Sequence, residues 1–240
     1  MRSLEKTEAR EGGGDAEAAE AVVIRRSART RRLTLRIDRH TGRAVVTAPP
    51  EAPKARIQRF LHAHAEWLRE QRGAVPPPIP IDVGSVLPLR GVPHRVVAGQ
   101  RRGRPVEIAE GRIVVNGDGA HHRRRLLDFL RREAKSDLAA AVARHTERLG
   151  LRHAGMTIRD TRSRWGSCTA QGHLNFSWRL ILAPPVVLDY LAAHEVAHLR
   201  HRHHKASFWQ TVETLHKEYR LAETWLKTNG GSLQRFRVEV

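Results

Sequence analysis

The chain has 240 residues, of which 40% are apolar and 5% aromatic, so its core must be built mainly from aliphatic side chains. The single cysteine, Cys168, excludes an internal disulfide, and no stretch approaches the roughly 20 apolar residues of a membrane span. The N-terminus has no apolar signal segment. We therefore expect a cytoplasmic protein with no membrane partner.

The formal net charge is +18, and 37 of the 43 basic residues are arginines. Arginine binds phosphate through its planar fork, which would suit nucleic acid or a nucleotide. The simpler interpretation is a genome-wide preference for arginine, because the arginines are spread along most of the chain. Either interpretation predicts non-specific binding to nucleic acid at low salt.

The first half of the chain predicts two segments. Residues 1–20 are rich in Gly, Glu and Ala with almost no large apolar side chains, which is typical of a disordered tail. Residues 21–118 predict a small β-rich subdomain with one helix. The elements expected there are strands at 22–24, 33–37 and 44–48, a turn at 40–43, a helix over 54–72, a proline-rich connector at 74–80, and short strands at 87–91, 94–97, 106–108 and 112–115.

Residues 119–240 predict the main core. Apolar residues recur at three- and four-residue steps from about 120 to Gly150, which indicates one long helix stopped by that glycine. A strand at 157–159 and a hairpin formed by 164–168 and 173–181 should follow. Pro184-Pro185 then opens a helix. Two further helices are expected over 207–217 and 219–227.

The helix that begins at Pro185 carries His194-Glu195-Val196-Ala197-His198. Two histidines four apart on a helix lie about 40° apart around its axis, so both imidazoles can reach one metal ion. A catalytic zinc site needs three protein ligands and a water. Glu195 adjoins the first histidine and is positioned to accept a proton from that water.

The third ligand is ambiguous from spacing alone, since His201, His203 and His204 all follow within six residues of His198. His201 would stay near the site if the helix continued. His204 can bind only if the helix breaks near residue 200, because six residues correspond to a rotation of about 240°. Such a turn commonly uses a positive φ, which histidine at position 201 tolerates better than most residues.

Several segments resemble the YgjP-like family, zincin-like metallopeptidases related to the SprT and WLM groups. The resemblance extends over roughly residues 22–225, and its motifs are Ser163–Cys168, Leu174–Pro185, Asp189-Tyr190, His194–Leu199, His203-His204 and Phe208-Trp209. It implies a zinc-dependent hydrolase of α+β zincin-like fold, with a metal-binding helix, a long helix and a β-hairpin. It also implies His204 as the third ligand, although the family's Asn-His-Ser triplet reads His203-His204-Lys205 here.

Other residues near the motifs are candidates for supporting roles. Arg164 and Arg179 could stabilise an oxyanion or hold phosphate, with salt bridges as the simpler interpretation. Asn175 and Ser167 are candidates for hydrogen bonds near the metal. Trp165, Trp178, Cys168, Phe208 and Trp209 are expected to be packing residues. Asp189 or backbone carbonyls should orient the metal-binding histidines.

Three functions follow from these observations. The first is a zinc metallopeptidase in which His194, His198 and His204 hold the metal, Glu195 activates water, and a strand at 174–182 forms the wall against which a peptide pairs. The second is a nucleotide pyrophosphatase acting on a substrate such as UTP, for which Arg162, Arg164 and Arg179 should converge near the metal. The third is a metal-bearing protein associated with nucleic acid, although no zinc ribbon or DNA-binding module is recognisable.

Overall fold

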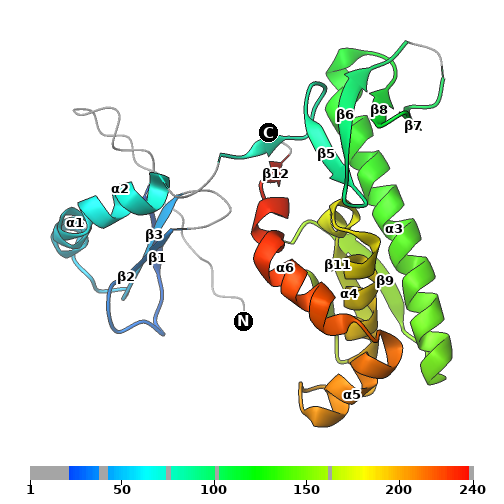
Figure 1. Cartoon of the computed structure of the whole chain (residues 1–240). Coiled ribbons are helices and arrows are strands. Elements are labelled where there is room, and N and C mark those ends of the chain that lie inside the picture. The colour runs from blue at the N-terminus through cyan, green and yellow to red at the C-terminus, as the bar shows by residue number, and fades with distance from the viewer. Residues whose placement is uncertain (1–21, 38–42, 74–76, 101–102, 162–163, 238–240) are drawn as a thin grey trace. The chain divides into compact units, whose positions relative to one another are not determined.

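The computed structural model describes residues 22–37, 43–73, 77–100, 103–161 and 164–237 (Figure 1). The chain divides into two compact units, Met1–Pro77 and Pro78–Val240. This division falls earlier than the boundary expected at residue 118, because the strands between residues 86 and 115 share one hydrophobic core with the long helix. The expected tail at 1–20, most of the turn at 40–43 and Arg162 lie outside the described residues.

The first unit is a three-stranded sheet covered by helices. Strand β3 is central, parallel to β1 and antiparallel to β2. Its side chains are almost fully buried, and Val46 and Ala48 pack with Ala52 and with Ile57 of the first helix. The elements are β1 (Val23–Arg26), β2 (Thr34–Ile37), β3 (Ala44–Ala48), α1 (Lys54–Ala63) and α2 (Ala65–Gly73).

The single helix expected over 54–72 is interrupted at His64. Its Nδ1 lies 2.8 Å from the carbonyl oxygen of Phe60, the acceptor that the backbone N–H of residue 64 would use in a continuous helix. That N–H bonds to Leu61 instead, at 3.2 Å. The side chain therefore competes with the backbone and separates α1 from α2.

The second unit is organised along one helix, α3 (His122–Leu149), which runs its length in Figure 1. The predicted long helix is confirmed, and it ends at Gly150, whose φ of 63° suits glycine. A four-stranded sheet of order β5-β6-β8-β7 packs at its N-terminal end. The strands are β5 (Val86–Leu89), β6 (Val92–Ala98), β7 (Val106–Ala109) and β8 (Arg112–Val115), the last followed by the 3₁₀ turn η1 (Gly119–His121).

A second sheet in this unit has the order β10-β11-β9. The strands are β9 (Gly155–Arg159), β10 (Gly166–Cys168) and β11 (His173–Ser177). The central strand β11 is parallel to β9 and antiparallel to β10, which leaves β10 as an edge strand. The sequence predicted that a strand at 174–182 would form a wall against which a peptide pairs. That prediction is wrong in detail, because β10 and β9 already pair with the two sides of β11.

The strand predicted over 173–181 ends at Ser177 and continues as a 3₁₀ helix, η2 (Trp178–Leu182). All five residues of η2 are buried, so they do not alternate between a core face and a solvent face as a half-buried strand would. Trp178 is fully buried and Trp165 packs against the same core, as expected for packing residues.

Three helices complete the unit: α4 (Pro185–Ala197), α5 (Ala206–Leu215) and α6 (Tyr219–Leu233). The helix predicted to open at Pro184-Pro185 is confirmed. Helix α6 runs past residue 227, where its end was expected, and includes the glycines at 230 and 231. A Cβ on Gly230 would lie 3.1 Å from the ring of Trp165, so this glycine makes room for the indole within the helix. Two short strands, β4 (Ile79–Pro80) and β12 (Phe236–Arg237), pair in parallel.

The turn between β5 and β6 supports the start of α4. The backbone N–H of Arg90 donates to the carbonyl of Ile181 at 2.7 Å, and that of Gly91 donates to Leu182 at 3.2 Å. The Arg90 guanidinium also binds Asp137 and Glu133 of α3 at 2.8 Å each. The four-stranded sheet thereby holds the segment that leads into the helix with the histidine pair.

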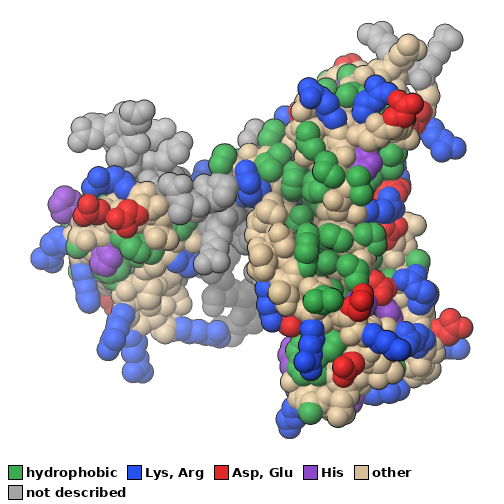
Figure 2. Space-filling view, in the orientation of Figure 1, with side chains coloured by type: hydrophobic (Ala, Val, Ile, Leu, Met, Phe, Trp, Pro, Cys, Tyr) green, Lys and Arg blue, Asp and Glu red, His purple; other side chains and the backbone are tan. Residues whose placement is uncertain are grey.

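Basic side chains are scattered over the visible faces of both units in Figure 2, which agrees with their even spread in the sequence. No helix in the described part of the chain combines the length and the apolar character needed to cross a membrane.

Candidate metal centre

Three histidines converge at the C-terminal end of α4. His194 lies in the last turn of the helix, His198 is its C-cap, and His204 comes from the loop before α5. One ring nitrogen from each lies within 4.8 Å of the others, and the Nε2 atoms of His194 and His204 are 3.2 Å apart. Among the described residues this is the one group of three or more histidine, cysteine or carboxylate side chains that converges in this way.

The loop reaches His204 because α4 stops at Ala197. The N–H groups of Arg200 and His201 both donate to the carbonyl of Ala197, which closes the last turn. The positive φ anticipated at His201 is not used, since Arg90 and Glu110 are the two non-glycine residues with positive φ in the described part of the chain. The ring of His201 points elsewhere, with its Nε2 lying 3.1 Å from Thr211 Oγ1.

The carbonyl of His201 has a separate role, because it accepts a hydrogen bond of 2.9 Å from Nδ1–H of His198. This bond assigns the proton to Nδ1 and leaves Nε2 with its lone pair facing the other two histidines. Of the two kinds of orienting partner expected from the sequence, the backbone carbonyl is therefore the one found at His198.

Phe208 of α5 packs under all three histidines. Its ring centroid lies 4.9 Å from that of His194, 4.5 Å from that of His198 and 4.7 Å from that of His204. The side chain is fully buried. The sequence identified Phe208 as a core residue, and the structure adds that it forms an apolar floor shared by the three rings.

Burial sets the protonation of the site. It lowers the pKa of His194 to about 3, with smaller contributions from His198 and His204. Burial also lowers the pKa of His198, opposed by the hydrogen bond to the carbonyl of His201. Both imidazoles are thus neutral at pH 7, which is the form that binds a metal ion.

Glu195 is 4% exposed, and its Oε2 has no hydrogen-bond partner. Burial raises the pKa of its carboxyl group to about 8 in the metal-free site, opposed by the charge of Arg164. The carboxylate lies against the first residue of β10: a Cβ added to Gly166 would be 2.5 Å from Glu195 Oε1. A glycine is needed at this position because the backbone and the carboxylate approach so closely.

A cavity of about 340 Å³ opens over this cluster. Its lining comprises the three histidines, Glu195, the three residues of β10, Arg164 and Arg202. Ser167 and Cys168 are thus at the site, and Cys168 is not part of the converging group of ligands. Arg202 was not anticipated from the sequence, where its only signal was its position two residues before His204.

Two predicted contacts lie elsewhere. Arg179 is buried, forms a salt bridge with Asp160 and donates a hydrogen bond to the carbonyl of Phe236. This structural role is the simpler of the two interpretations that the sequence allowed. Asn175 accepts a hydrogen bond of 2.8 Å from Arg159 through Oδ1. Neither residue lines the cavity over the histidines. The sequence could not distinguish Arg164 from Arg179, because both adjoin segments that lead to the site.

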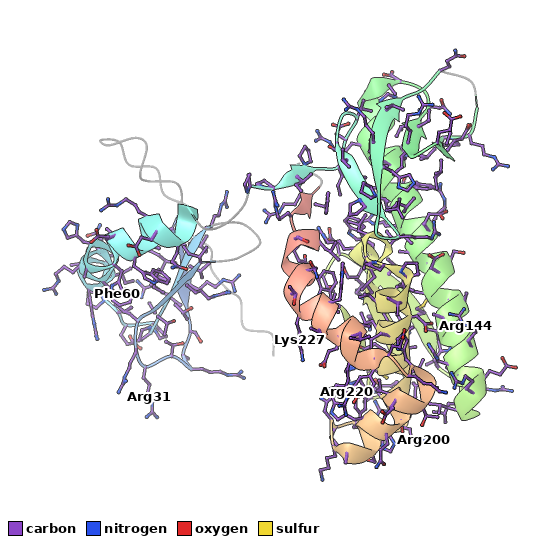
Figure 3. All side chains as sticks on the ribbon, in the orientation of Figure 1. Arg31, Phe60, Arg144, Arg200, Arg220 and Lys227 are labelled. Atoms are coloured by element: carbon purple, nitrogen blue, oxygen red, sulfur yellow. The ribbon has the colours of Figure 1, made fainter. Side chains whose placement is uncertain are left out.

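Asp189, the other expected orienting partner, instead joins α4 to α3. Its Oδ1 accepts from Arg144, labelled in Figure 3, at 2.8 Å and from His145 Nε2 at 3.0 Å. Burial acts to raise the pKa of Asp189, but the hydrogen bonds and charges of His145 and Arg144 together hold it below the ordinary value. Asp189, five residues before His194, therefore fastens α4 to α3. Within the described part of the chain it does not contact the histidines of α4.

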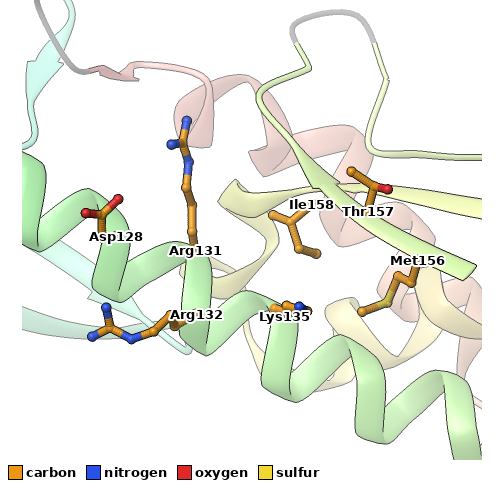
Figure 4. A pocket seen from close by; sticks show the side chains of 7 residues that line it. All are labelled: Asp128, Arg131, Arg132, Lys135, Met156, Thr157 and Ile158. Carbon is orange, nitrogen blue, oxygen red and sulfur yellow. The ribbon is translucent and has the colours of Figure 1, made fainter.

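A larger cavity of about 530 Å³ lies between α3 and β9 (Figure 4). Arg131, Arg132 and Lys135 line it along the helix, while Met156 and Ile158 line it from the strand. None of the three converging histidines contributes to it. Part of the basic charge therefore gathers away from the histidine cluster.

The histidine cluster fits a tetrahedral metal ion. Nitrogen ligands at 2.0–2.1 Å from zinc stand about 3.3 Å apart, close to the 3.2 Å between the Nε2 atoms of His194 and His204. All three donors are imidazoles, and the nearby Glu195 carries an unpartnered carboxylate oxygen. The donor set and the separation of His194 and His204 therefore suit a divalent metal ion such as zinc.

Comparison with known families agrees with this geometry. The sequence model of the YgjP-like metallopeptidase domain matches residues 31–229. The chain belongs to the YgjP-like metallopeptidase family. This membership implies a divalent metal and a peptide substrate, and the mixed helix and strand architecture is that of an α+β metallopeptidase domain.

The crystal structure of the metallopeptidase zymogen of Pyrococcus abyssi abylysin is similar in part. It is 21% identical and aligns with 42% of this YgjP-like chain and 99% of its own, at a TM-score of 0.36. No curated protein matches significantly.

Proposed function

We propose that this YgjP-like protein is a zinc-dependent peptidase in which His194, His198 and His204 hold the metal and Glu195 is the general base. The observation that carries the proposal is the convergence of three ring nitrogens within 4.8 Å beside a buried carboxylate. When bound there, zinc supplies Lewis-acid chemistry, polarising a carbonyl group and lowering the pKa of water toward about 7.

Glu195 moves the protons. Its carboxylate accepts a proton from the attacking water as the water oxygen bonds to the scissile carbonyl carbon. It then delivers that proton to the amide nitrogen as the C–N bond breaks, so that the amine leaves in neutral form. The close approach of Gly166 holds the carboxylate on the β10 side of the cavity.

Strand β10 is suited to hold the substrate. It is an edge strand, and all three of its residues line the cavity beside Glu195. An extended peptide can add to such an edge through main-chain hydrogen bonds. In the proposed zincin-like core, α4 and its C-cap supply His194 and His198, the loop before α5 supplies His204, and β10 takes the place of the strand originally expected as the wall.

The test is the substitution Glu195→Gln. We expect this variant to retain stoichiometric zinc and to lose turnover of casein by about 10²–10⁴-fold, the usual contribution of a general base. Unchanged turnover would end the assignment. Release of pyrophosphate from UTP, measured on the same preparations, tests the nucleotide alternative, for which the family comparison offers no support.

A further inference from the structure

The substrate-facing strand has a positive side chain near each end. Arg164 precedes β10 by two residues, is exposed and lines the cavity. At the other end, Arg202 donates to the carbonyl oxygens of Thr169 at 2.5 Å and Ala170 at 2.6 Å, directly after the strand. Both arginines line the cavity, and along the chain one precedes and the other binds just after the three residues against which an extended peptide would pair.

Neither guanidinium forms an ion pair within the described part of the chain, although the charge of Arg164 acts on the Glu195 carboxyl group. Within the described residues, no aspartate or glutamate lies within 4.0 Å of the Arg164 or Arg202 guanidinium as an ion-pair partner. Glu195 is the single acidic residue in the lining of the cavity, and it faces Gly166 between the two arginines. Ser167 and Cys168, which lie between the ends, are small. The cavity thus offers positive charge to both sides of the reacting centre.

We propose that Arg164 and Arg202 make the enzyme select extended peptides with an acidic side chain on each side of the scissile bond. This inference rests on the proposed peptidase function. Arg164 precedes Gly166, the residue of β10 that Glu195 meets, by two residues, and the two carbonyls that Arg202 binds follow Gly166 by three and four residues. A paired extended peptide rises about 3.3 Å per residue, so the acidic side chains should stand about two to four residues from the scissile bond.

The experiment uses three matched peptides that differ only at these flanking positions, which carry Glu, Gln or Lys. Binding is measured by fluorescence anisotropy with zinc-loaded Glu195→Gln, and turnover is measured with the unsubstituted enzyme. We expect the Glu peptide to bind and react best and the Lys peptide worst. Each of Arg164→Gln and Arg202→Gln should reduce the preference by about threefold, as an exposed ion pair contributes, and the double variant should remove it.

Two controls separate local from general effects. Arg95→Gln removes the same charge at an exposed site on β6 that does not line the cavity, and it should leave the preference intact. Arg202→Lys keeps the charge while disturbing the paired bonds to Thr169 and Ala170, and it should retain most of the preference. If Arg202→Lys loses as much as Arg202→Gln, Arg202 positions the hairpin and does not select substrate.

The outcomes also separate this inference from the peptidase proposal. Equal binding of the Glu and Lys peptides would overturn the inference even if both are cut. An equal loss of preference in Arg95→Gln would assign the effect to net charge and overturn it as well. Selective binding of the Glu peptide without cleavage would support the inference and contradict the peptidase proposal.

Discussion

Glu195 and Gly166 are in such close apposition that a Cβ on the glycine would lie 2.5 Å from one carboxylate oxygen and 2.8 Å from Cγ. The carboxylate is thereby positioned by the backbone of β10. In the proposed mechanism, the same three residues of β10 set the position of both the general base and the peptide.

Replacing Gly166 by alanine should displace the Glu195 side chain. We expect turnover to fall by about 10²-fold, because displacement of a catalytic group by about 1 Å costs that much, while zinc binding stays intact. Casein cleavage and metal analysis measure the two effects. Gly231→Ala is the matched control, since nothing lies within 4 Å of its added methyl group. Full activity in Gly166→Ala would show that Glu195 has room elsewhere.

Replacing His204 by alanine should release the metal. The loss of zinc affinity should exceed the roughly 10–100-fold that loss of an outer hydrogen-bond partner causes. A chromogenic chelator titration measures it. The neighbouring His203 is exposed, so His203→Ala should bind zinc normally. Tight, stoichiometric zinc in His204→Ala would mean that the third ligand has been misidentified.

Replacing Phe208 by leucine should weaken metal binding through the loss of packing beneath the three imidazoles. A comparable core change, Val212→Ala, lies in the same helix and is also fully buried. Each variant should lose about 1–3 kcal/mol of unfolding free energy. Only Phe208→Leu should also lower zinc affinity. Equal zinc affinities in the two variants would limit Phe208 to general packing.

The pH dependence of stability should report on Asp189. The native pKa of this carboxylate is below its ordinary value, so its ionised form stabilises the fold above the unfolded pKa of about 3.9. That contribution is lost as the pH falls through the lower native pKa. We expect Asp189→Asn to cost about 1–3 kcal/mol at pH 7 and progressively less as the medium becomes more acidic.

Urea denaturation of both proteins at several pH values measures this difference. Asp128→Asn, which removes a carboxylate from α3 that lines the larger cavity, should change stability by less than about 0.5 kcal/mol. If the loss of unfolding free energy in Asp189→Asn stays constant down to pH 3, the effect of the substitution comes from the shape of the side chain and not from its charge.

The sequence predicted those features that follow from local periodicity. The apolar steps along residues 122–149, the glycine stop at 150 and the proline start at 185 all appear in the structure. The histidine pair lies on one face because a four-residue step always places it there. These inferences needed no knowledge of distant contacts.

The remaining features depend on contacts between distant segments. Residues 178–182 form a 3₁₀ helix that is buried throughout, and a short, largely apolar run does not distinguish such a segment from a buried strand. Arg179 and Arg164 differ in role because only one of them faces the cavity. His64 breaks a helix through a single side-chain bond. Such effects are decided by tertiary structure, which overrides local preference.

The turn at Arg90 and Gly91 has a practical consequence for anyone seeking a minimal enzyme. A fragment starting at residue 119 would keep the three converging histidines and Glu195. It would nevertheless leave Glu133 and Asp137 without their arginine and the carbonyls of Ile181 and Leu182 without their donors. We expect that fragment to be expressed as insoluble material, whereas truncation to Pro78 should yield a protein that still loads zinc.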